Sequence, residues 1–195
     1  EGLLATGSPE EPEIRAEPND LFAIFYTSGT TGGPKGVMLS QENFLSAAIN
    51  HIIAYQLGPS DVCLRVMPFY HTMEASMVVC QFYVGGTNVI VDAFDADSFW
   101  QLVAAEKLTH LTLVYPMLRD IMDAYHKKGY DRGSFRFFSL GGQTTPTKII
   151  REAIQTLGKG SVTIVYSLKA ASPLINSLHE DDTATEGEGP RPPGY

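Results

Sequence analysis

A regular alternation of strand-like and helix-like segments is the feature that most constrains the fold of this chain. Short apolar runs predict strands, and longer stretches with helical apolar spacing predict the helices between them. The predicted strands span 21–26, 37–39, 62–68, 87–91, 109–115, 135–140 and 162–166, and the predicted helices span 40–56, 74–83, 97–106, 116–126 and 146–157. Repeated strand–helix alternation therefore predicts an α/β fold with a mostly parallel sheet flanked by helices.

Three of these segments carry specific expectations about burial. The run 21–26 is apolar and aromatic, which is typical of a buried strand. The segment 74–83 predicts an apolar, buried helix that ends at a pair of glycines. Ser40 is a suitable N-cap for the helix that follows it, and that helix is expected to carry one apolar stripe made of Phe44, Leu45, Ala48, Ile49, Ile52 and Ile53.

The acidic residues are concentrated at the two ends of the chain, which has 195 residues and a formal net charge of −8. Residues 1–20 hold six acidic side chains against one base, and residues 179–195 hold five against one. The central region is nearly neutral, which argues against a protein that binds nucleic acid through a basic surface. We expect an acidic linker or arm at 1–19, an α/β core at 20–178 and an acidic Gly/Pro-rich segment at 179–195.

The two cysteines, Cys63 and Cys80, lie inside apolar segments and have no metal-ligand spacing around them. They predict buried thiols in a reducing compartment rather than a disulfide or a metal site. No apolar run reaches the roughly 18 residues that a membrane span needs, and no signal-peptide pattern follows Glu1. The sequence therefore predicts a cytoplasmic location, no membrane span and no metal bound by protein side chains alone.

The segment 27–36 contains four hydroxyl side chains, four glycines and Lys35 within ten residues. Glycines let backbone N–H groups converge into an anion-binding nest, and the hydroxyls and the lysine add donors and positive charge. The pattern differs from the common P-loop because Pro34 precedes the lysine and Gly36 follows it. The segment therefore predicts a phosphate-binding loop, and its alternative interpretation is a flexible hairpin loop.

Residues 26–37, YTSGTTGGPKGV, resemble the phosphate-loop signature of the adenylate-forming superfamily, which includes AMP-dependent synthetases, acyl-CoA synthetases and luciferases. The resemblance implies one subdomain of the adenylate-forming fold and the binding of ATP. It also implies catalytic roles for Thr27 and Lys35 near the triphosphate. The implied nucleotide contacts in this loop are Thr27, Ser28, Gly29, Thr30, Thr31, Gly32 and Lys35.

Residues 68–71, PFYH, resemble a segment of acyl- and aryl-CoA ligases, in which the histidine borders the carboxylate substrate and the thiol channel. The resemblance implies a catalytic and substrate-binding role for His71, whose alternative role is that of a packed or capping histidine. It also implies an acyl pocket that includes Met73, Glu74 and Leu140. Glu74 departs from the family, which often has glycine there, so its carboxylate is expected to alter or block the pocket.

Two further segments follow predicted strands. Gly141, Gly142 and Gln143 are similar to a family turn that lies against adenine and the acyl group; the alternative is an ordinary βα turn. Residues 166–173, YSLKAASP, are similar to the family pattern Y-G-x-T-E-A-S-P, which implies nucleotide contacts from Tyr166 and Ser167. In the family the threonine of this pattern contacts the α-phosphate and the glutamate binds Mg²⁺, but Lys169 and Ala170 stand there in this chain.

Together these segments imply a carboxylate–CoA ligase that forms an acyl-AMP intermediate and then an acyl-CoA thioester. Its cofactors and substrates would be ATP, Mg²⁺, CoA and a small carboxylic acid. The resemblance covers about 20–178, a central part of the family's unit, so we expect N- and C-terminal subdomains to be missing and these residues alone to be inactive. The alternative is a degenerate nucleotide-binding or interaction module without ligase activity, which Ser167, Lys169 and Ala170 favour.

Overall fold

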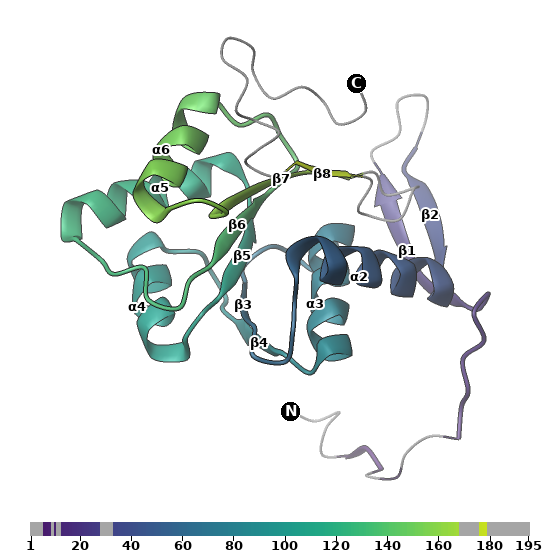
Figure 1. Ribbon diagram of the computed structural model, residues 1–195. Helices are drawn as coiled ribbons and strands as arrows, with labels where there is room; N and C mark the ends of the chain where they lie inside the picture. Colours follow the sequence, from purple (N-terminus) through teal and green to yellow (C-terminus); the bar gives the residue numbers. More distant parts are fainter. Residues whose placement is uncertain (1–5, 9, 11–12, 28–32, 168–175, 179–195) are drawn as a thin grey trace.

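The computed structural model describes residues 6–8, 10, 13–27, 33–167 and 176–178. Its centre is a six-stranded sheet with the strand order β4-β3-β5-β6-β7-β8, in which only β8 runs antiparallel to its neighbour (Figure 1). The strands span Val62–Arg65 (β3), Thr87–Ile90 (β4), His110–Leu113 (β5), Phe137–Leu140 (β6), Val162–Tyr166 (β7) and Asn176–Leu178 (β8). The predicted α/β fold with a mostly parallel sheet is confirmed.

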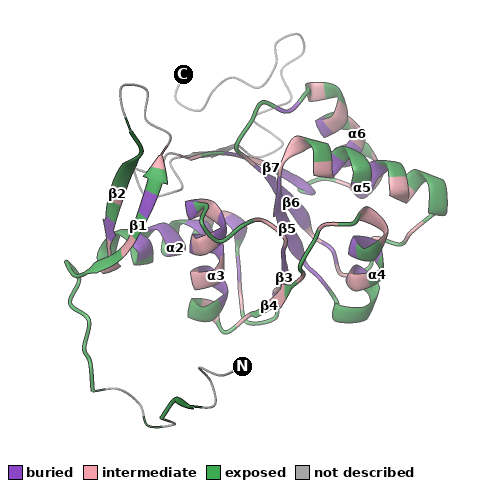
Figure 2. Ribbon diagram, turned by 180° about the vertical axis from the view of Figure 1, so that it is seen from behind, coloured by how far each residue is buried: buried purple, intermediate pink, exposed green. Residues whose placement is uncertain are grey.

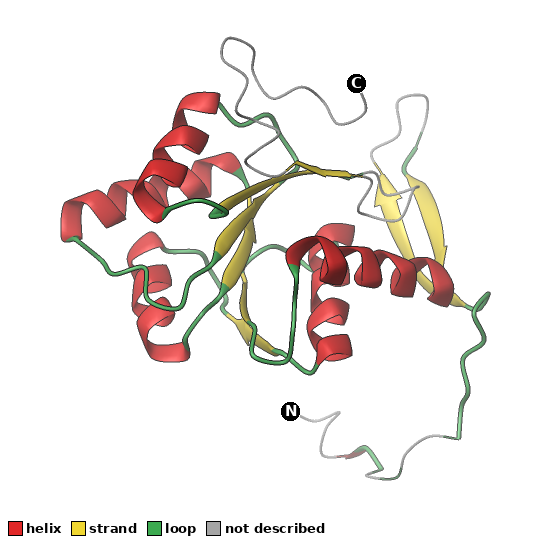
Figure 3. Ribbon diagram, in the orientation of Figure 1, coloured by secondary structure: helices red, strands yellow, loops and turns green. Residues whose placement is uncertain are grey.

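Helices cover both faces of this sheet, as the ribbon coloured by secondary structure shows (Figure 3). One face carries α2 and α3, and the other carries α4, α5 and α6. Their bounds are Gln41–Tyr55 (α2), Thr72–Val84 (α3), Ala96–Glu106 (α4), Tyr115–Lys128 (α5) and Thr147–Leu157 (α6). None of the described helices is long and apolar enough to cross a bilayer.

The ends of the helices follow from local sequence. Ser40 begins α2 with a capping box, in which its hydroxyl accepts from the Asn43 N–H and the Asn43 side chain accepts from the Ser40 N–H. Gly85 ends α3 in the left-handed conformation at a φ of 73°. These contacts confirm the predicted cap at Ser40 and the predicted glycine stop after α3.

The two faces of the sheet differ in polarity. The face toward α4, α5 and α6 is apolar, and Trp100 packs there with its Nε1 donating to the Ile121 carbonyl at 3.1 Å. The opposite face, toward α2 and α3, buries polar side chains from the alternate strand positions. Tyr55 Oη lies 2.8 Å from Ser139 Oγ, and Gln81 Nε2 lies 3.4 Å from His110 Nε2. The strands therefore present apolar residues to α4, α5 and α6, and a mixture of polar residues with the apolar Phe137 and Val165 to α2 and α3.

A separate two-stranded antiparallel sheet, β1 (Leu21–Thr27) and β2 (Lys35–Ser40), packs on α2. Phe25 and Leu39 face inward and form a small cluster with Phe44. The prediction of a buried strand at 21–26 is wrong, because in β1 only Phe25 is buried and the residues on the other face are largely exposed (Figure 2). A hairpin with one packed face has the period-2 burial of a surface sheet rather than the burial of a central strand.

The predicted apolar stripe of α2 is also only partly buried. Phe44 and Ala48 are buried, whereas Leu45, Ile49 and Ile53 are exposed, Ile53 by 70%. A step of one residue turns an α-helix by about 100°, so neighbouring apolar residues project in different directions and only one set meets the sheet. The prediction for 74–83 needs a similar correction at its end, since Phe82 and Tyr83 are exposed.

Candidate functional site

Three of the loops with predicted chemistry leave the same edge of the sheet. Leu113 pairs with Leu140 and Leu140 with Ile164 in parallel register, so β5, β6 and β7 end together. Strand β3 is parallel to β5 and ends at Arg65 on that edge. The loops that follow β3, β6 and β7 therefore open on the carboxyl edge, where parallel α/β sheets bind ligands.

The predicted phosphate loop at 27–36 begins at the last residue of β1 and ends in β2. Thr27 and Lys35 are partners in the antiparallel register, and Thr27 Oγ1 donates to the Lys35 carbonyl at 3.4 Å. The Lys35 side chain is exposed. Five of the predicted contacts lie outside the described residues: Ser28, Gly29, Thr30, Thr31 and Gly32.

His71 lies in the loop after β3, at the N-cap position of α3. Its backbone N–H donates to the Pro68 carbonyl at 3.0 Å, and its carbonyl accepts from the Ala75 N–H at 3.1 Å. The imidazole is exposed, lies 4.7 Å from the Tyr70 ring between centroids, and makes no capping hydrogen bond. The interpretation of His71 as a packed or capping side chain is therefore wrong, and the ring is available to a ligand.

The turn after β6 requires both of its glycines. A Cβ at Gly141 would lie 2.8 Å from Val165 Cγ2, and Gly142 has a φ of +80°, which side chains rarely adopt. Gln143 is exposed next to them. The turn thus presents bare backbone at the carboxyl edge, beside the end of the neighbouring strand β7.

Strand β7 ends at Tyr166, whose side chain is half-exposed, and Ser167 follows it half-buried. Lys169 and Ala170 lie outside the described residues. In sequence, the loops after β3, β6 and β7 up to residue 173 contain no carboxylate, and the first one beyond β3 is Glu74 in α3. The donors present therefore do not form the carboxylate set that usually holds Mg²⁺.

The predicted acyl-pocket residues have different environments. Met73 is half-buried against the cluster between the sheet and α2 and α3, and Leu140 is buried in the core that α4, α5 and α6 cover. Glu74 is 1% exposed, and its Oε2 lies 3.9 Å from Arg65 Nη1. Burial raises the pKa of Glu74 to about 7, although the Arg65 charge acts in the opposite direction.

Sequence reasoning missed a layer of buried titratable groups between the sheet and α2 and α3. His51 donates from Nδ1 to the Ala47 carbonyl at 2.7 Å, and burial lowers its pKa to about 4. Burial likewise lowers the pKa of His110 to about 3. Cys63 and Cys80 are free and buried, as predicted, and burial raises the pKa of each thiol to about 12. A signal was present in the sequence, since Arg65 and His110 are titratable residues within predicted strands that are otherwise uncharged.

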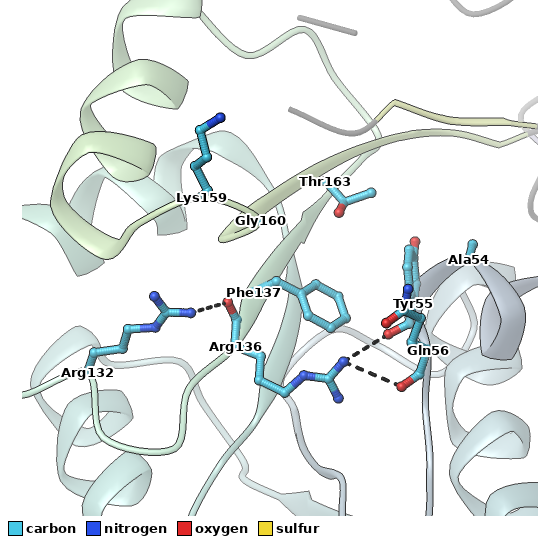
Figure 4. A pocket seen from close by; sticks show the side chains of 9 residues that line it. All are labelled: Ala54, Tyr55, Gln56, Arg132, Arg136, Phe137, Lys159, Gly160 and Thr163. Atoms are coloured by element: carbon cyan, nitrogen blue, oxygen red, sulfur yellow. Dashed lines mark hydrogen bonds between the residues drawn. The ribbon is translucent and has the colours of Figure 1, made fainter. Parts of the chain in front are cut away.

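A cavity of about 340 Å³ lies at the amino ends of β6 and β7, the edge opposite to these loops (Figure 4). Arg136 Nη1 lies 2.6 Å from Asp61, and Arg136 Nη2 donates to the Tyr55 carbonyl at 3.2 Å. Arg132 donates to the carbonyls of Phe135, Leu157 and Arg136. The guanidinium groups therefore hold the loops around the cavity in place through hydrogen bonds. None of the predicted site residues lines this cavity.

Comparison with known proteins adds a family match. The sequence model described as AMP-binding enzyme matches residues 2–193. The chain is 28% identical over 194 residues to the medium-chain fatty-acid–CoA ligase of Escherichia coli, covering 95% of this chain and 34% of that protein. It is 30% identical over 186 residues to 2-succinylbenzoate–CoA ligase of Bacillus anthracis, covering 94% and 38%. The chain thus spans about a third of the length of these curated relatives.

Solved structures share the fold. The N-terminal domain of FACL13 from Mycobacterium tuberculosis superposes with a TM-score of 0.85 at 27% identity, covering 92% of this chain and 45% of that one. ATP-bound MatB from Rhodopseudomonas palustris superposes with a TM-score of 0.76 at 26% identity, covering 91% and 35%. The O-succinylbenzoate–CoA synthetase of Bacillus subtilis, in complex with ATP and magnesium, has a TM-score of 0.80 at 23% identity, covering 92% and 37%.

Proposed function

Because the chain belongs to the AMP-binding enzyme family, we propose that it is the ATP-binding core of a carboxylate–CoA ligase. In this reaction a carboxylate attacks ATP to form an acyl-AMP with release of pyrophosphate, and the thiol of CoA then displaces AMP to form the acyl-CoA thioester. The observation that carries the proposal is the shared carboxyl edge, on which the His71 loop, the Gly141–Gly142 turn and the end of β7 open together. The named relatives, which are CoA ligases, support the same reaction class.

The chemistry requires no nucleophile from the protein. The substrate carboxylate attacks the α-phosphorus, so catalysis consists of positioning the reactants and stabilising the developing charge. We assign the Lys35 ammonium and the hydroxyl of Thr27 to the phosphates. The glycine turn at 141–142 gives a flat ring close access to backbone, and the half-exposed Tyr166 offers an aromatic surface beside it. We assign His71 to the carboxylate and the incoming thiol.

Magnesium, when bound, would neutralise phosphate charge during adenylate formation. In this chain Ala170 and Lys169 replace the groups that the family uses for the metal and the α-phosphate, so the protein donors do not fit a side-chain-held Mg²⁺. We therefore propose that the whole ligase adenylates slowly. We also propose that these 195 residues alone are inactive. The same substitutions favour the second candidate function, a nucleotide-binding module without ligase activity.

Calorimetric titration with ATP, with and without Mg²⁺, tests the proposal. Because Mg²⁺ can bind through the ATP phosphates and water without a protein carboxylate, we still expect Mg²⁺-dependent binding to the chain. We also expect a large loss in Lys35→Ala and unchanged binding in the control Lys159→Ala, which changes a lysine at the opposite edge. Binding that is independent of the metal supports a degenerate nucleotide-binding module instead. Absence of binding contradicts the ligase core and supports an interaction module without ligase activity. ATP- and CoA-dependent turnover by the chain in a coupled assay would contradict the proposed inactivity.

A further inference from the structure

Glu74, the departure noted within the His71 segment, forms a buried ion pair with Arg65. The exposed fraction is 0% for the Arg65 side chain and 1% for the Glu74 side chain, and Glu74 Oε2 lies 3.9 Å from Arg65 Nη1. Among the described ion pairs, this is the one in which both side chains are almost completely buried. Two charges are rarely withdrawn from water unless they compensate each other.

The Arg65 guanidinium joins three elements. Its Nε donates to Asn88 Oδ1 in β4 at 2.7 Å, and its Nη2 donates to the Met77 carbonyl in α3 at 2.7 Å. Arg65 itself is the last residue of β3. One side chain thus links the carboxyl end of β3 to Asn88 in the first half of β4 and to Met77 in the middle of α3, and planar arginine is well suited to such multiple contacts.

The position of the pair in the chain gives it a local effect. Arg65 lies immediately before the loop 66–71, and Glu74 lies in the first turn of α3, immediately after that loop. The N–H of Met67, inside the loop, also favours the charged carboxylate, although it makes no direct hydrogen bond to it. The ion pair therefore joins the residue before the loop to the helix turn after it, and we call this link the closure of the loop.

We propose that Arg65 and Glu74 are positioning residues that hold the loop 66–71, and with it His71, at the carboxyl edge of the sheet. The role of His71 rests on the proposed function, whereas the closure of the loop does not. On this view Glu74 is not a residue of the acyl pocket and acts from the buried side of the loop. Its carboxylate faces Arg65 and fixes the backbone from which the imidazole projects.

Hydrogen–deuterium exchange of the chain tests this proposal through peptides that cover 66–75, with peptides of β5 and β6 as the internal reference. The variants are Glu74→Gln, Arg65→Met and the double variant. In the double variant no charge is left unpaired, so the core is expected to recover protection that a single variant loses. The control is Asp61→Asn, which breaks the Arg136–Asp61 pair at the opposite edge of the sheet.

We expect the hydrogen-exchange rate in 66–75 to rise at least about tenfold relative to β5 and β6 in both single variants. This factor is the lower end of the effect that is typical when a charged group loses its contact. The double variant is expected to keep the fast loop while its core is protected again, and Asp61→Asn is expected to change the loop no more than the core. A loop that exchanges within about twofold of wild type in the double variant, beside a protected core, overturns the proposal.

Carbethoxylation of His71 by diethyl pyrocarbonate, followed by mass spectrometry, adds a readout that general destabilisation does not move. We expect the rate of carbethoxylation at His71 to differ from wild type in the double variant and to equal it in Asp61→Asn. A rate equal to wild type in both variants would contradict the positioning role. The outcome is separable from the proposed function, because ATP binding by wild type is measured independently. If wild type does not bind ATP but the loop exchanges faster in the variants, the ligase proposal is contradicted. The proposed role of Arg65 and Glu74 in holding the loop is then still supported.

Discussion

Acidification should destabilise this fold through its two buried histidines. His51 and His110 have pKa values near 4 and 3 in the folded chain, against 6.5 for an ordinary histidine. Below pH 6.5 the unfolded chain therefore binds two protons that the folded chain does not accept. Glu74 acts in the opposite direction, since its pKa is about 7 when folded and 4.5 ordinarily, so between these values the folded chain holds one proton more.

The net magnitude follows from these three groups. Between pH 6.5 and 4.5 the unfolded state binds about one proton more than the folded state, so the free energy of unfolding falls by about 1.4 kcal/mol for each pH unit lost. Over this window the loss is about 2 to 3 kcal/mol, a large part of the 5–15 kcal/mol typical of a domain. Above about pH 8 all three groups have the same charge in both states, and their contribution to the pH dependence disappears.

Urea denaturation followed by far-UV circular dichroism, from pH 4.5 to 7.5, measures the slope. Glu74→Gln removes the opposing proton and is expected to double the slope to about two protons, whereas His110→Gln is expected to abolish it. The slope is the readout, so a lower absolute stability in either variant does not affect the comparison. Wild-type stability that is constant or rises on acidification in this window, or equal slopes in all three proteins, would contradict the shifted pKa values of His51, His110 and Glu74.

Three other substitutions test local features, each by urea denaturation. Ser40→Ala removes the α2 capping box and should cost about 1 kcal/mol, against less than about 0.5 kcal/mol for Ser46→Ala on the exposed side of the same helix; equal effects would contradict the assigned cap. Gly142→Ala should cost about 1 to 2 kcal/mol because its φ is +80° and space is otherwise available, and Gly33→Ala, with open space and no such φ, is its control. Trp100→Ala should cost about 3 to 5 kcal/mol, since it leaves a cavity in the core under α4 and α5; a cost below 1 kcal/mol would mean that this core is loosely packed.

The sequence was sufficient for the elements whose signals are local. The Ser40 cap, the glycine that ends α3 and the strand at Val162–Tyr166 were all predicted from a few neighbouring residues. The burial of β1 was not, because an apolar strand has the same sequence appearance in a central sheet and in a surface hairpin. The partners of Glu74 were also hidden, since Arg65 meets it only when β3 and α3 pack together.

The candidate site shows the same division. The glycines at 141 and 142 form the turn after β6 that the sequence predicted, because turn geometry depends on the residues of the turn. The binding roles of these glycines and of His71 stay predictions. The shared edge on which these segments open follows from the parallel register, which the alternation of strands and helices already implied. The polar layer beneath α2 and α3 depends on which strand face meets which helix, and that was not readable from the motifs.

The location of bound nucleotide tests the central claim most directly. Hydrogen–deuterium exchange of the chain with and without saturating ATP and Mg²⁺ would map it peptide by peptide. We predict slower exchange at 33–36, 68–71 and 141–145, with no change at 132–137 and 159–163 around the cavity at the opposite edge. Protection confined to the cavity residues, or no protection anywhere with ATP in excess, would contradict the assignment of the carboxyl edge as the nucleotide site.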